Sequence, residues 1–523
     1  MLVIEKVNAL VMNLNNPARV MASIPTAQPL TVGGKQVTVV PHEHDEVRVL
    51  RNLGIMAPAP ILHYYNWPGH FTPYEHQRMT AAFLTMNRRG LVLNDIGTGK
   101  TNSALWAIDY LKKSIGMGKV LIVSPLSTLE RVWGDTIFTE FPNLSSVTLY
   151  GTAQRRLKLL QQDVDLYIIN HNGFGIISDN IVGMFDLILI DEAAVYRNPS
   201  SNLFKIMYKW LTSNPDVRVW LMTGTPTPNA PTDAWALSRL IKNVFVTQTF
   251  TAFRDQTMIK VNGTNLIPRI NSTATVFSIL RPAVRYKRDD CVDLPPTVVQ
   301  VRQAKLSAEQ SKLYKIMMND LLIDAAAHKA GTENITAVNA AVKIQKLVQI
   351  SCGVAYDDQK NEVHINCKPR VDLLKEIISE AGEKIIVFVP LTGTLHMIER
   401  ELSRQWTVSV VNGAVTPKKR NKIFSDFQTE DDPHILLAHP ATMAHGLTLT
   451  AASTIIWYGP ITSNEQYVQA NGRIERIGKR YVSNVVQIVA TPLEEKMYKR
   501  LESKQKLQDL LLDLIEEGTD KPS

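Results

Sequence analysis

The residues best suited to chemistry in this chain lie in the stretch LVLNDIGTGKT, which ends at Thr101. Its two glycines free the backbone to turn, and the residues that follow have the apolar spacing of a helix. Such a turn points backbone N–H groups and the positive end of a helix dipole at a phosphate. Lys100 would reach the β and γ phosphates, and Thr101 would offer a hydroxyl to Mg²⁺. The predicted phosphate-binding loop consists of Gly97, Thr98, Gly99, Lys100 and Thr101.

The loop departs from the usual pattern at its first position, where Asn94 stands in place of a glycine. A glycine-rich turn before a helix also occurs as a purely structural feature, so a second signal is needed. The stretch FDLILIDEAAVYRN supplies one, because Asp191 and Glu192 directly follow an apolar strand. Asp191 would hold Mg²⁺, and Glu192 would orient or deprotonate the attacking water. An isolated Asp-Glu pair is usually a cap, but in register with a phosphate loop it favours catalysis.

Two further stretches of the first half fit a nucleotide site. Gln77 lies on the helix predicted upstream of the loop, and its amide matches the donor and acceptor edge of adenine. The stretch LMTGTPTPN offers Thr223 and Thr225 in a tight turn, where their hydroxyls would sense the γ-phosphate. The same turn is also compatible with a structural role alone.

The second half of the chain carries arginines at helical spacing. In NEQYVQANGRIERIG, Gln469, Arg473 and Arg476 fall at positions i, i+4 and i+7 and so share one helix face. Arginines presented to a γ-phosphate stabilise the charge of the transition state. The alternative is a helix with surface arginines, which would be the default if the first half had no nucleotide motifs.

Strands and helices alternate around both sets of motifs. Apolar strands such as KVLIVSP and DLILIDE, separated by helices, predict a parallel sheet covered on both faces. The pattern pauses between Ala230 and about Cys367 and returns from Lys384. We therefore predict an α/β fold with four parts: a small α+β accessory domain at 1–70, a first lobe at 71–295 with a helical insertion, a helical connecting region at 296–368, and a second lobe at 369–523 with a C-terminal helix.

Two clusters are open to more than one interpretation. The stretch HYYNWPGHF brings Tyr64, Tyr65, Trp67 and Phe71 together, and aromatic rings of this kind either stack on bases or, more commonly, form core at a domain junction. The stretch RPAVRYKRDD is either a basic contact surface or a solvated linker. Its charged members are Arg281, Arg285, Lys287 and Arg288.

Composition excludes several classes of protein. The 45% of apolar and 20% of charged residues are typical of a soluble globular chain, and the net charge of +8 is compatible with a polyanionic partner. Three cysteines without a CxxC pair indicate neither a disulfide framework nor a zinc site. No apolar run approaches the ~18 residues of a membrane span, and the N-terminal stretch MLVIEKVNALVMNL is interrupted by polar residues. We therefore expect a cytoplasmic protein without a membrane partner.

The order of the motifs resembles that of superfamily-two helicases, and within them the Swi/Snf-type DNA translocases. DIGTGKT, LIVSPLSTLERVW, DEAA and TGTP resemble the motifs of the first lobe, and ATMAHGLTLTAASTIIWYGP with QANGRIERIGK those of the second. The stretches RPAVRYKRDDCVDLPP, LSAEQSKLY and KLVQISCGVAY resemble connecting signatures of the Swi/Snf group, and GLTLTAAS is similar to the annealing-helicase branch. The resemblance covers about residues 72 to 500.

The resemblance implies two RecA-like lobes and an ATPase that uses Mg²⁺ and acts on duplex, forked or branched DNA with little sequence preference. It implies ATP-site roles for the loop and for Gln77, Gln469, Asp191, Glu192, Arg473 and Arg476, with the last two acting as arginine fingers when the lobes close. It places Ser124, Pro125, Thr448 and Thr450 on the face that contacts the DNA backbone. The compact length is similar to that of phage or bacterial enzymes of DNA repair, recombination or replication.

Two features limit the transfer of these roles. Glu475 stands where the group usually has histidine, and the chain is too short for the chromatin-reading modules of eukaryotic remodellers. A strand-separating helicase, an RNA-directed helicase and a non-hydrolysing nucleic-acid clamp remain as alternatives. Intact Lys100, Asp191 and Glu192 argue against the clamp. Protein partners and the role of residues 1–70 are left open, although the first 70 residues are placed where they could help to recognise a junction.

Overall fold

The computed structural model describes residues 1–224, 227, 230–242, 249–261, 265–287, 291, 297–329, 337–357, 359, 361–443, 449–474 and 483–503. The chain divides into two compact units, Met1–Val292 and Asp293–Ser523. Each unit is described separately below. Among the described residues, no helix combines the length and the apolar character that crossing a bilayer requires.

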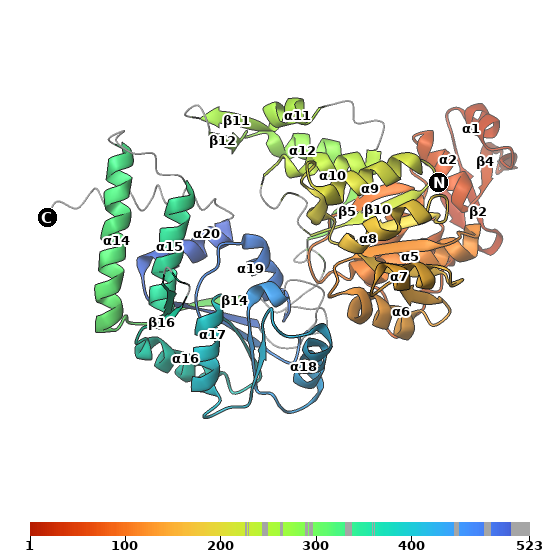
Figure 1. Ribbon diagram of the computed structural model, residues 1–523. Helices are drawn as coiled ribbons and strands as arrows, with labels where there is room; N and C mark the ends of the chain where they lie inside the picture. The colour runs from red at the N-terminus through yellow and green to blue at the C-terminus, as the bar shows by residue number, and fades with distance from the viewer. Residues whose placement is uncertain are drawn as a thin grey trace. The chain divides into compact units, whose positions relative to one another are not determined.

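The chain begins with a four-stranded antiparallel sheet in the order β1-β2-β4-β3 (Figure 1). Its strands are β1 (Leu2–Ile4), β2 (Ala9–Met12), β3 (Gln28–Val32) and β4 (Lys35–Pro41). Gly33 and Gly34 close the β3–β4 hairpin with φ angles of 56° and 77°, which a two-residue turn between twisted strands requires. The helices α1 (Pro17–Ser23), α2 (His44–Asn52) and α3 (Ile61–Tyr64) complete this α+β region.

A seven-stranded parallel sheet forms the centre of the first unit. Its order is β13-β5-β10-β9-β6-β8-β7. The strands are β13 (Ala283–Val284), β5 (Arg89–Val92), β10 (Arg218–Met222), β9 (Leu187–Ile190), β6 (Val120–Ser124), β8 (Leu166–Asn170) and β7 (Ser146–Thr148). Alternate residues of the central strands enter two different buried clusters, as Leu189 and Ile190 do. The continuous apolar runs of the sequence therefore reflect a sheet that is buried on both faces.

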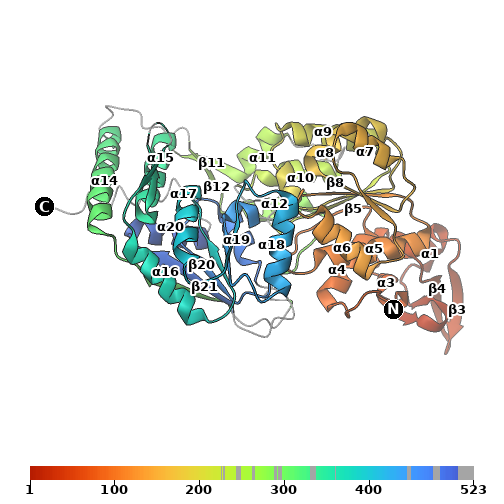
Figure 2. The same ribbon diagram turned by 60° about the horizontal axis from the view of Figure 1, so that its bottom comes forward.

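Helices cover both faces of this sheet (Figure 2). One face packs against α4 (Glu75–Met86), α5 (Lys100–Ile115) and α6 (Asp135–Glu140), and it shares its buried cluster with the N-terminal α+β region. The other face packs against α7 (Ala153–Leu160), α8 (His171–Ile177), α9 (Asn202–Ser213) and α10 (Asp233–Lys242). Beyond α10 lie α11 (Phe250–Thr257), the hairpin of β11 (Met258–Val261) and β12 (Asn265–Pro268), and α12 (Ser272–Leu280).

The second unit has its own parallel sheet of six strands, in the order β14-β21-β20-β17-β19-β18. The strands are β14 (Thr297–Gln303), β21 (Ser483–Val489), β20 (Thr454–Trp457), β17 (Ile385–Phe388), β19 (Ile435–Ala438) and β18 (Val408–Val411). One face packs against α15 (Ala337–Cys352), α16 (Lys368–Ala381) and α17 (Thr392–Leu402). The other packs against α18 (Pro417–Thr429) and α19 (Asn464–Asn471). The remaining elements are α14 (Ala308–Lys329), the hairpin of β15 (Val354–Tyr356) and β16 (Glu362–His364), and α20 (Pro492–Ser503).

The expected α/β class is thus confirmed, with two parallel sheets covered by helices and a small α+β region at the start. The segment 296–368, expected to be a helical connection, contains α14 and α15 but begins with β14, which pairs with β21 along its whole length. Most of its side chains are exposed, because it is an edge strand. Its alternation therefore carried no strong apolar signal. The four-part division of the chain remains a prediction.

Candidate active site

The first half of the candidate site is the loop between β5 and α5. Gly97 and Gly99 have φ angles of 85° and 78°, a left-handed backbone that favours glycine. Gly99 is constrained twice, because a Cβ at this position would also overlap the side-chain amide of Gln77. Helix α5 begins at Lys100, so its free N–H groups and the positive end of its dipole lie at the loop. This is the geometry that the sequence predicted for phosphate binding.

Carbonyl oxygens of the loop hold the Lys100 side chain. Its Nζ donates to the carbonyl oxygens of Asn94 and Asp95 at 2.9 and 3.0 Å. These bonds fold the ammonium group back over the turn, where it faces the same loop that would hold phosphate. Thr98 closes the turn from within, since its Oγ1 donates to the Asp95 carbonyl at 2.8 Å. Hydrogen bonds within the loop therefore fix its backbone around the Lys100 ammonium group.

Helix α4 holds the loop from the side. Gln77 Nε2 donates to the Thr98 carbonyl at 3.2 Å, and His76 Nε2 lies 3.0 Å from the same oxygen. The Gln77 Oε1 accepts from the Tyr74 N–H at 3.1 Å, as part of the capping box of α4. Both side chains are buried. The Gln77 amide thus contacts the phosphate loop here, and its pairing with adenine remains a prediction.

Asn94, the position that departs from the usual loop pattern, connects three segments. It is 1% exposed. Its Nδ2 donates to Thr80 Oγ1 of α4 at 2.9 Å, and its Oδ1 accepts from the Tyr286 N–H at 3.0 Å. The Asp95 N–H also donates to the Tyr286 carbonyl at 3.1 Å. Because one side-chain amide both donates and accepts, it binds α4 and the segment after β13 together, a role that sequence analysis did not foresee.

The second component of the site lies where β9 ends, on a central strand of the same sheet. Asp191 is buried, and its carboxylate accepts three hydrogen bonds. Oδ2 accepts from Ser124 Oγ and Trp133 Nε1, both at 3.1 Å, and Oδ1 accepts from the Glu192 N–H at 3.0 Å. Burial raises the pKa of Asp191, while the positive charge of Lys100 and these hydrogen bonds act in the opposite direction. The structure therefore brings the two strongest predicted residues, Lys100 and Asp191, into electrostatic contact.

Glu192 stands in an unusual backbone conformation, with φ 48° and ψ 49°. A left-handed conformation is costly for a residue with a side chain, and such residues cluster at functional sites. It is the N-cap of the short helix Ala193–Tyr196. The sharp turn places two consecutive carboxylates in different directions, so one is buried beside Ser124 while the other is partly exposed.

Ser124 and Pro125, predicted to contact DNA, are both buried. Besides its bond to Asp191, Ser124 Oγ lies 2.6 Å from Thr128 Oγ1 and accepts from Trp133 Nε1 at 3.0 Å. The Pro125 carbonyl accepts from Thr128 Oγ1 at 2.8 Å. Their contact with DNA remains a prediction, whereas the structure adds Trp133 and Thr128 to the surroundings of Asp191. A lone tryptophan on a helix gave no sequence signal for this role.

The turn after β10 lies directly against the phosphate loop. Thr223 is fully buried, and its N–H donates to the Val92 carbonyl at 3.0 Å. A Cβ on Gly224 would lie 3.5 Å from the Asn94 carbonyl oxygen and 3.3 Å from Ile96. Thr223 therefore bonds to the end of β5, and Gly224 lies against the loop itself. The role of this turn in sensing the γ-phosphate remains a prediction. Thr225 lies outside the described residues.

The donor set suits Mg²⁺. A carboxylate offers about four lone-pair positions, and three on Asp191 are used by protein donors. Mg²⁺ commonly takes one or two protein oxygens and completes its shell with water and phosphate, so Asp191 with the Thr101 hydroxyl meets its needs. Within the described ranges, no group of three or more His, Cys, Asp or Glu side chains forms an alternative metal site.

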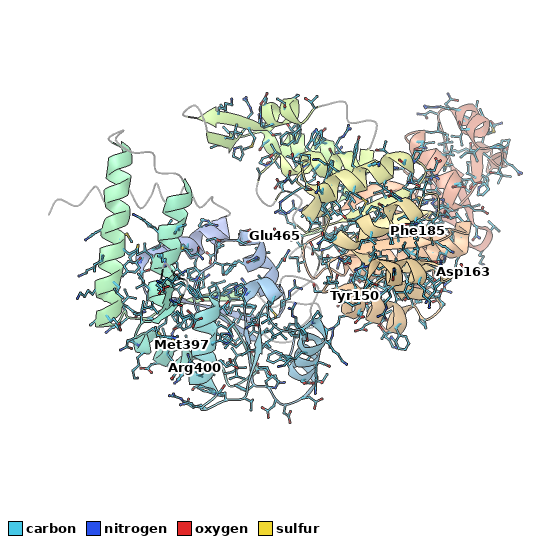
Figure 3. The ribbon with its side chains drawn as sticks, viewed as in Figure 1. Tyr150, Asp163, Phe185, Met397, Arg400 and Glu465 are labelled. Carbon is cyan, nitrogen blue, oxygen red and sulfur yellow. The ribbon has the colours of Figure 1, made fainter. Side chains whose placement is uncertain are left out.

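The second unit carries the remaining predicted residues. Arg473 is 3% exposed, and its carbonyl accepts from the Leu449 N–H at 3.0 Å. Gln469 is buried on α19, and its Nε2 donates to Glu465 Oε1 at 3.4 Å. Figure 3 labels Glu465 on this helix. Thr450 Oγ1 accepts from Gln428 Nε2 of α18 at 3.1 Å. Three other predicted positions of this unit lie outside the described part of the chain, namely Thr448, Glu475 and Arg476.

The fold and the site together define a protein with two RecA-like lobes, the first of which carries a phosphate loop beside a buried aspartate. Residues 42–353 match the SNF2-related domain, and residues 369–478 match the helicase conserved C-terminal domain. The chain belongs to the SNF2-related family. The resemblance inferred from the sequence is thereby confirmed.

Similar proteins come from distant organisms. The chromodomain-helicase-DNA-binding protein 1-like of Danio rerio is 26% identical over 86% of this chain, which spans 44% of that protein. The protein p41 of Acyrthosiphon pisum secondary endosymbiont phage 1 is 26% identical over 85% of this chain and 99% of its own length. A solved SWI2/SNF2 ATPase core of Sulfolobus solfataricus in complex with dsDNA is 21% identical, with a TM-score of 0.38 over 86% of this chain and 94% of that chain.

Proposed function

We propose that this protein is a DNA-dependent ATPase that couples hydrolysis of ATP to movement along duplex, forked or branched DNA. The observation that carries the proposal is the position of the buried Asp191 within electrostatic reach of Lys100, in a member of the SNF2-related family. The name of the Danio rerio relative, a helicase that binds DNA, supports the same activity. Hydrolysis yields ADP and phosphate.

The first unit would bind the nucleotide. Lys100 and the N-terminus of α5 hold the phosphates, and Thr101 with Asp191 would hold Mg²⁺. When bound, the metal ion supplies positive charge to the phosphate oxygens. Glu192, which is partly exposed beside Asp191, orients the attacking water or accepts its proton. Gln77 is proposed to release its bond to Thr98 when it pairs with adenine.

The second unit would supply the groups that make hydrolysis depend on the whole motor. Arg473 and Arg476 act as arginine fingers in this proposal, and Gln469 as a further nucleotide contact. The Arg473 carbonyl accepts from the Leu449 N–H, and the Arg473 N–H donates to the Ala470 carbonyl. These backbone bonds connect the two segments of the second unit that resemble family motifs. A change at one segment would therefore be felt at the other.

DNA would be held through its phosphates. Arg281, Arg285 and Lys287 are exposed in the segment that runs beside the phosphate loop, as a basic contact surface requires, although a solvated linker would be exposed as well. Arg288 lies outside the described residues. Thr448 and Thr450 would add contacts from the second unit. Phosphate contacts carry little sequence information and release counterions, so we expect weak sequence preference and a steep loss of affinity with salt.

The comparisons also bear on where this enzyme would act. The match to p41 over nearly its full length supports an enzyme that acts in a bacterial or phage-infected cell, in DNA repair, recombination or replication.

The N-terminal region would help to recognise a branch. A triple variant, Lys6→Ala with Arg19→Ala and Lys35→Ala, changes exposed basic residues of this region and leaves its shared core in place. It should reduce the preference for forked over linear duplex while leaving stimulation by linear duplex intact. An unchanged preference would remove this part of the proposal.

Steady-state ATP hydrolysis tests the central activity. The rate should be measured without nucleic acid and with single-stranded DNA, duplex DNA, forked DNA and duplex RNA. Glu192→Gln serves as the blank, because it keeps the side-chain volume and removes the acid–base function. Strong stimulation by duplex or forked DNA that is absent in the variant supports the proposal. A greater stimulation by RNA would favour an RNA-directed enzyme, and a flat profile would favour a clamp.

A further inference from the structure

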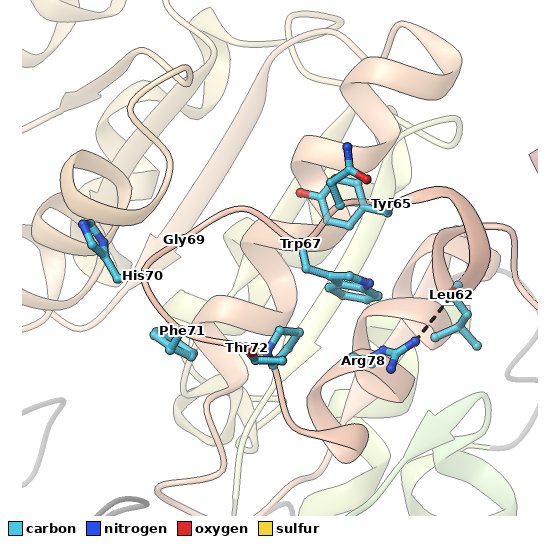
Figure 4. A pocket seen from close by; sticks show the side chains of 10 residues that line it. Leu62, Tyr65, Trp67, Gly69, His70, Phe71, Thr72 and Arg78 are labelled. Atoms are coloured by element: carbon cyan, nitrogen blue, oxygen red, sulfur yellow. Dashed lines mark hydrogen bonds between the residues drawn. The ribbon is translucent and has the colours of Figure 1, made fainter.

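A cavity that the nucleotide site does not use lies within the first unit, ahead of α4 (Figure 4). Its volume is about 440 Å³, and it is lined mainly by the segment between Leu62 and Pro73, together with Arg78. Tyr65, Trp67 and Phe71 contribute aromatic rings, while Thr72 and Arg78 contribute polar groups. The aromatic cluster that sequence analysis left open between core and base stacking therefore borders a cavity.

The aromatic wall is held rigidly by α5. Trp67 packs edge-on against Trp106 with ring centres 5.7 Å apart, and against Tyr65 at 5.2 Å. Tyr65 donates its hydroxyl to Asp109 Oδ2 at 2.6 Å, and Trp106 Nε1 donates to the Pro68 carbonyl at 2.7 Å. Phe71 differs from these rings, since 43% of it is exposed. A fixed wall of this kind binds a flat ligand at low cost in conformational entropy.

Arg78 forms the polar side of the cavity. Its guanidinium lies 5.6 Å from the centre of the Trp67 ring, and its Nη2 donates to the Leu62 carbonyl at 3.3 Å (Figure 4). Its Nη1 lies 3.8 Å from a carboxylate oxygen of Glu75. Its Nε is buried without a hydrogen-bond acceptor among the described residues. The arginine thus keeps donor capacity that the surrounding protein does not fill, and an acceptor in the cavity would use it.

The loop around the cavity is under backbone strain. Trp67 has a φ angle of 50°, which is a left-handed conformation for a bulky side chain. Gly69 has a φ angle of 121°, and a Cβ there would lie 2.7 Å from Glu140 Oε2. The His70 N–H donates to that same Glu140 oxygen at 2.7 Å and so secures the loop. Strain of this kind persists where the surrounding structure maintains it, often at ligand sites.

The chemistry of the lining selects a planar group with apolar faces and a polar edge. Rings supply the faces, and Thr72 and Arg78 supply hydrogen bonds for the edge. The arginine and the histidine of the lining both have acidic neighbours, Arg78 with Glu75 and His70 with Glu140. The cavity therefore does not form a cluster of unopposed positive charge, as a phosphate site would. A nucleobase meets these requirements.

Such a base could come from a nucleotide of DNA or from ATP, and the position of the cavity distinguishes these two sources. Gln77 faces the phosphate loop, and Arg78, the next residue, projects about 100° away around α4. The residues that line the cavity include neither Gln77 nor any residue of the phosphate loop, so the cavity is separate from the predicted contact with the base of ATP. We propose that this cavity binds a nucleobase, contributed by an unpaired nucleotide of DNA. The inference rests on the proposed function for its DNA partner, and the base of ATP is the other source of the same chemistry.

Binding of the full chain to two forked DNAs tests the proposal. One fork carries normal unpaired nucleotides at the junction, and the other carries abasic nucleotides there, which remove the bases and keep the phosphates. Wild-type protein should bind the normal fork at least about fivefold more tightly. Phe71→Ala and Arg78→Gln should lose this preference and bind both forks alike. Thermal unfolding of each variant confirms that it is folded.

Matched controls lie on the same unit. Phe138→Ala removes an aromatic ring on α6 that is 81% exposed and does not line the cavity. Arg48→Gln removes an arginine that, like Arg78, pairs with a carboxylate three residues before it on a helix. Both should keep the wild-type preference for the normal fork. The same loss of preference in these controls would overturn the proposal.

A second experiment distinguishes a base of DNA from the base of ATP as the occupant of the cavity. The KM values for ATP, GTP and CTP are measured for wild type and Arg78→Gln. A selective loss of ATP preference, with abasic forks bound as well as normal ones, would assign the cavity to the nucleotide base and overturn the DNA source. If Arg78→Gln changed neither the preference for the normal fork nor the KM values, base binding in this cavity would be overturned. A wild-type protein that binds no fork and hydrolyses ATP at the same rate with or without DNA would instead contradict the proposed function.

Discussion

At the scale of single residues, the phosphate loop depends on an amide in an unexpected place. Thr80 Oγ1 donates to the His76 carbonyl at 2.6 Å, so it can only accept from Asn94. The Asn94 Oδ1 in turn accepts from the Tyr286 N–H. A glycine could make neither bond, and an aspartate could not donate to Thr80. Asn94 therefore positions the carbonyl that holds Lys100, and it connects the loop to the segment after β13.

Replacement of Asn94 by aspartate tests this role. The change keeps the shape and loses the bond to Thr80, so we expect ATP affinity to fall by about three- to tenfold, in line with one net hydrogen bond. Thr80→Val removes the same bond from the other side. In a double-mutant cycle measured by binding of a fluorescent ATP analogue, the two changes should be strongly non-additive. Asn180→Asp, at an exposed position of the same unit that does not line the cavity, serves as the control. Additive losses would contradict the account.

A second prediction at the scale of residues concerns how kcat/KM for ATP hydrolysis falls at acid pH. The indole of Trp133 donates to the Asp191 carboxylate, and this bond favours the ionised form and lowers the pKa of Asp191. Trp133→Phe removes the donor, so the pKa of Asp191 rises and the carboxylate becomes protonated at a higher pH. At subsaturating Mg²⁺, the acid limb of kcat/KM should therefore move to higher pH.

The control for this change is Trp220→Phe. Trp220 is also fully buried in the first unit, but its Nε1 donates to the Asn87 carbonyl at 3.0 Å, away from Asp191. Its loss should affect stability without moving the acid limb. An unmoved limb in Trp133→Phe, or an equal movement in both variants, would show that Asp191 does not set the acid side of the profile.

At the scale of elements, one buried ion pair ties the helices of the second unit to its sheet. Arg370 of α16 donates to Glu494 of α20 at 2.8 and 3.1 Å, and also to the Tyr458 and Ile488 carbonyls. Both charged side chains are about 1% exposed. The carboxylate further accepts from Ser351 Oγ at 2.8 Å. This network satisfies the buried guanidinium from several elements at once.

Glu494→Gln should therefore destabilise the second unit. The substitution leaves a buried guanidinium without its counter-charge, and loss of one partner of a buried pair costs about 3–5 kcal/mol. The neighbouring variant Glu495→Gln breaks only a surface pair with Lys499, which contributes about 0–1 kcal/mol. Urea unfolding of the full chain should separate the two. Equal midpoints for both variants would contradict the importance of the buried network.

The elements also show how far sequence reasoning reaches. Both parallel sheets, the phosphate loop and the Asp191–Glu192 turn were predictable, because apolar runs and strand-end polar residues are local signals. The bonds of Asn94 to Thr80 and Tyr286 were not, since Tyr286 is 192 residues away in the chain. The contact of Trp133 with Asp191 spans 58 residues and is set by packing. Likewise β14 was missed, because most of its side chains are exposed and its sequence TVVQVRQ lacks the continuous apolar run of the buried strands.

At the scale of the whole molecule, an ATP site in the first unit is proposed to work with predicted DNA contacts on both units. A net charge of +8 and the exposed basic residues near the phosphate loop fit a polyanionic partner, and phosphate-based binding leaves the motor free to move between sequences. The family shows that both lobes of such a motor are present, while the activity itself remains a proposal. Movement is the part of the proposal that hydrolysis alone does not test.

Displacement of a third strand from duplex DNA tests that movement most directly. A labelled oligonucleotide is bound as a triplex on a long duplex, and its release is followed after addition of ATP. We predict release by the wild-type protein that requires ATP hydrolysis, is absent in Glu192→Gln and leaves the two strands of the duplex paired. Stimulation of hydrolysis by duplex DNA without any release of the third strand would contradict the claim that this protein is a translocase.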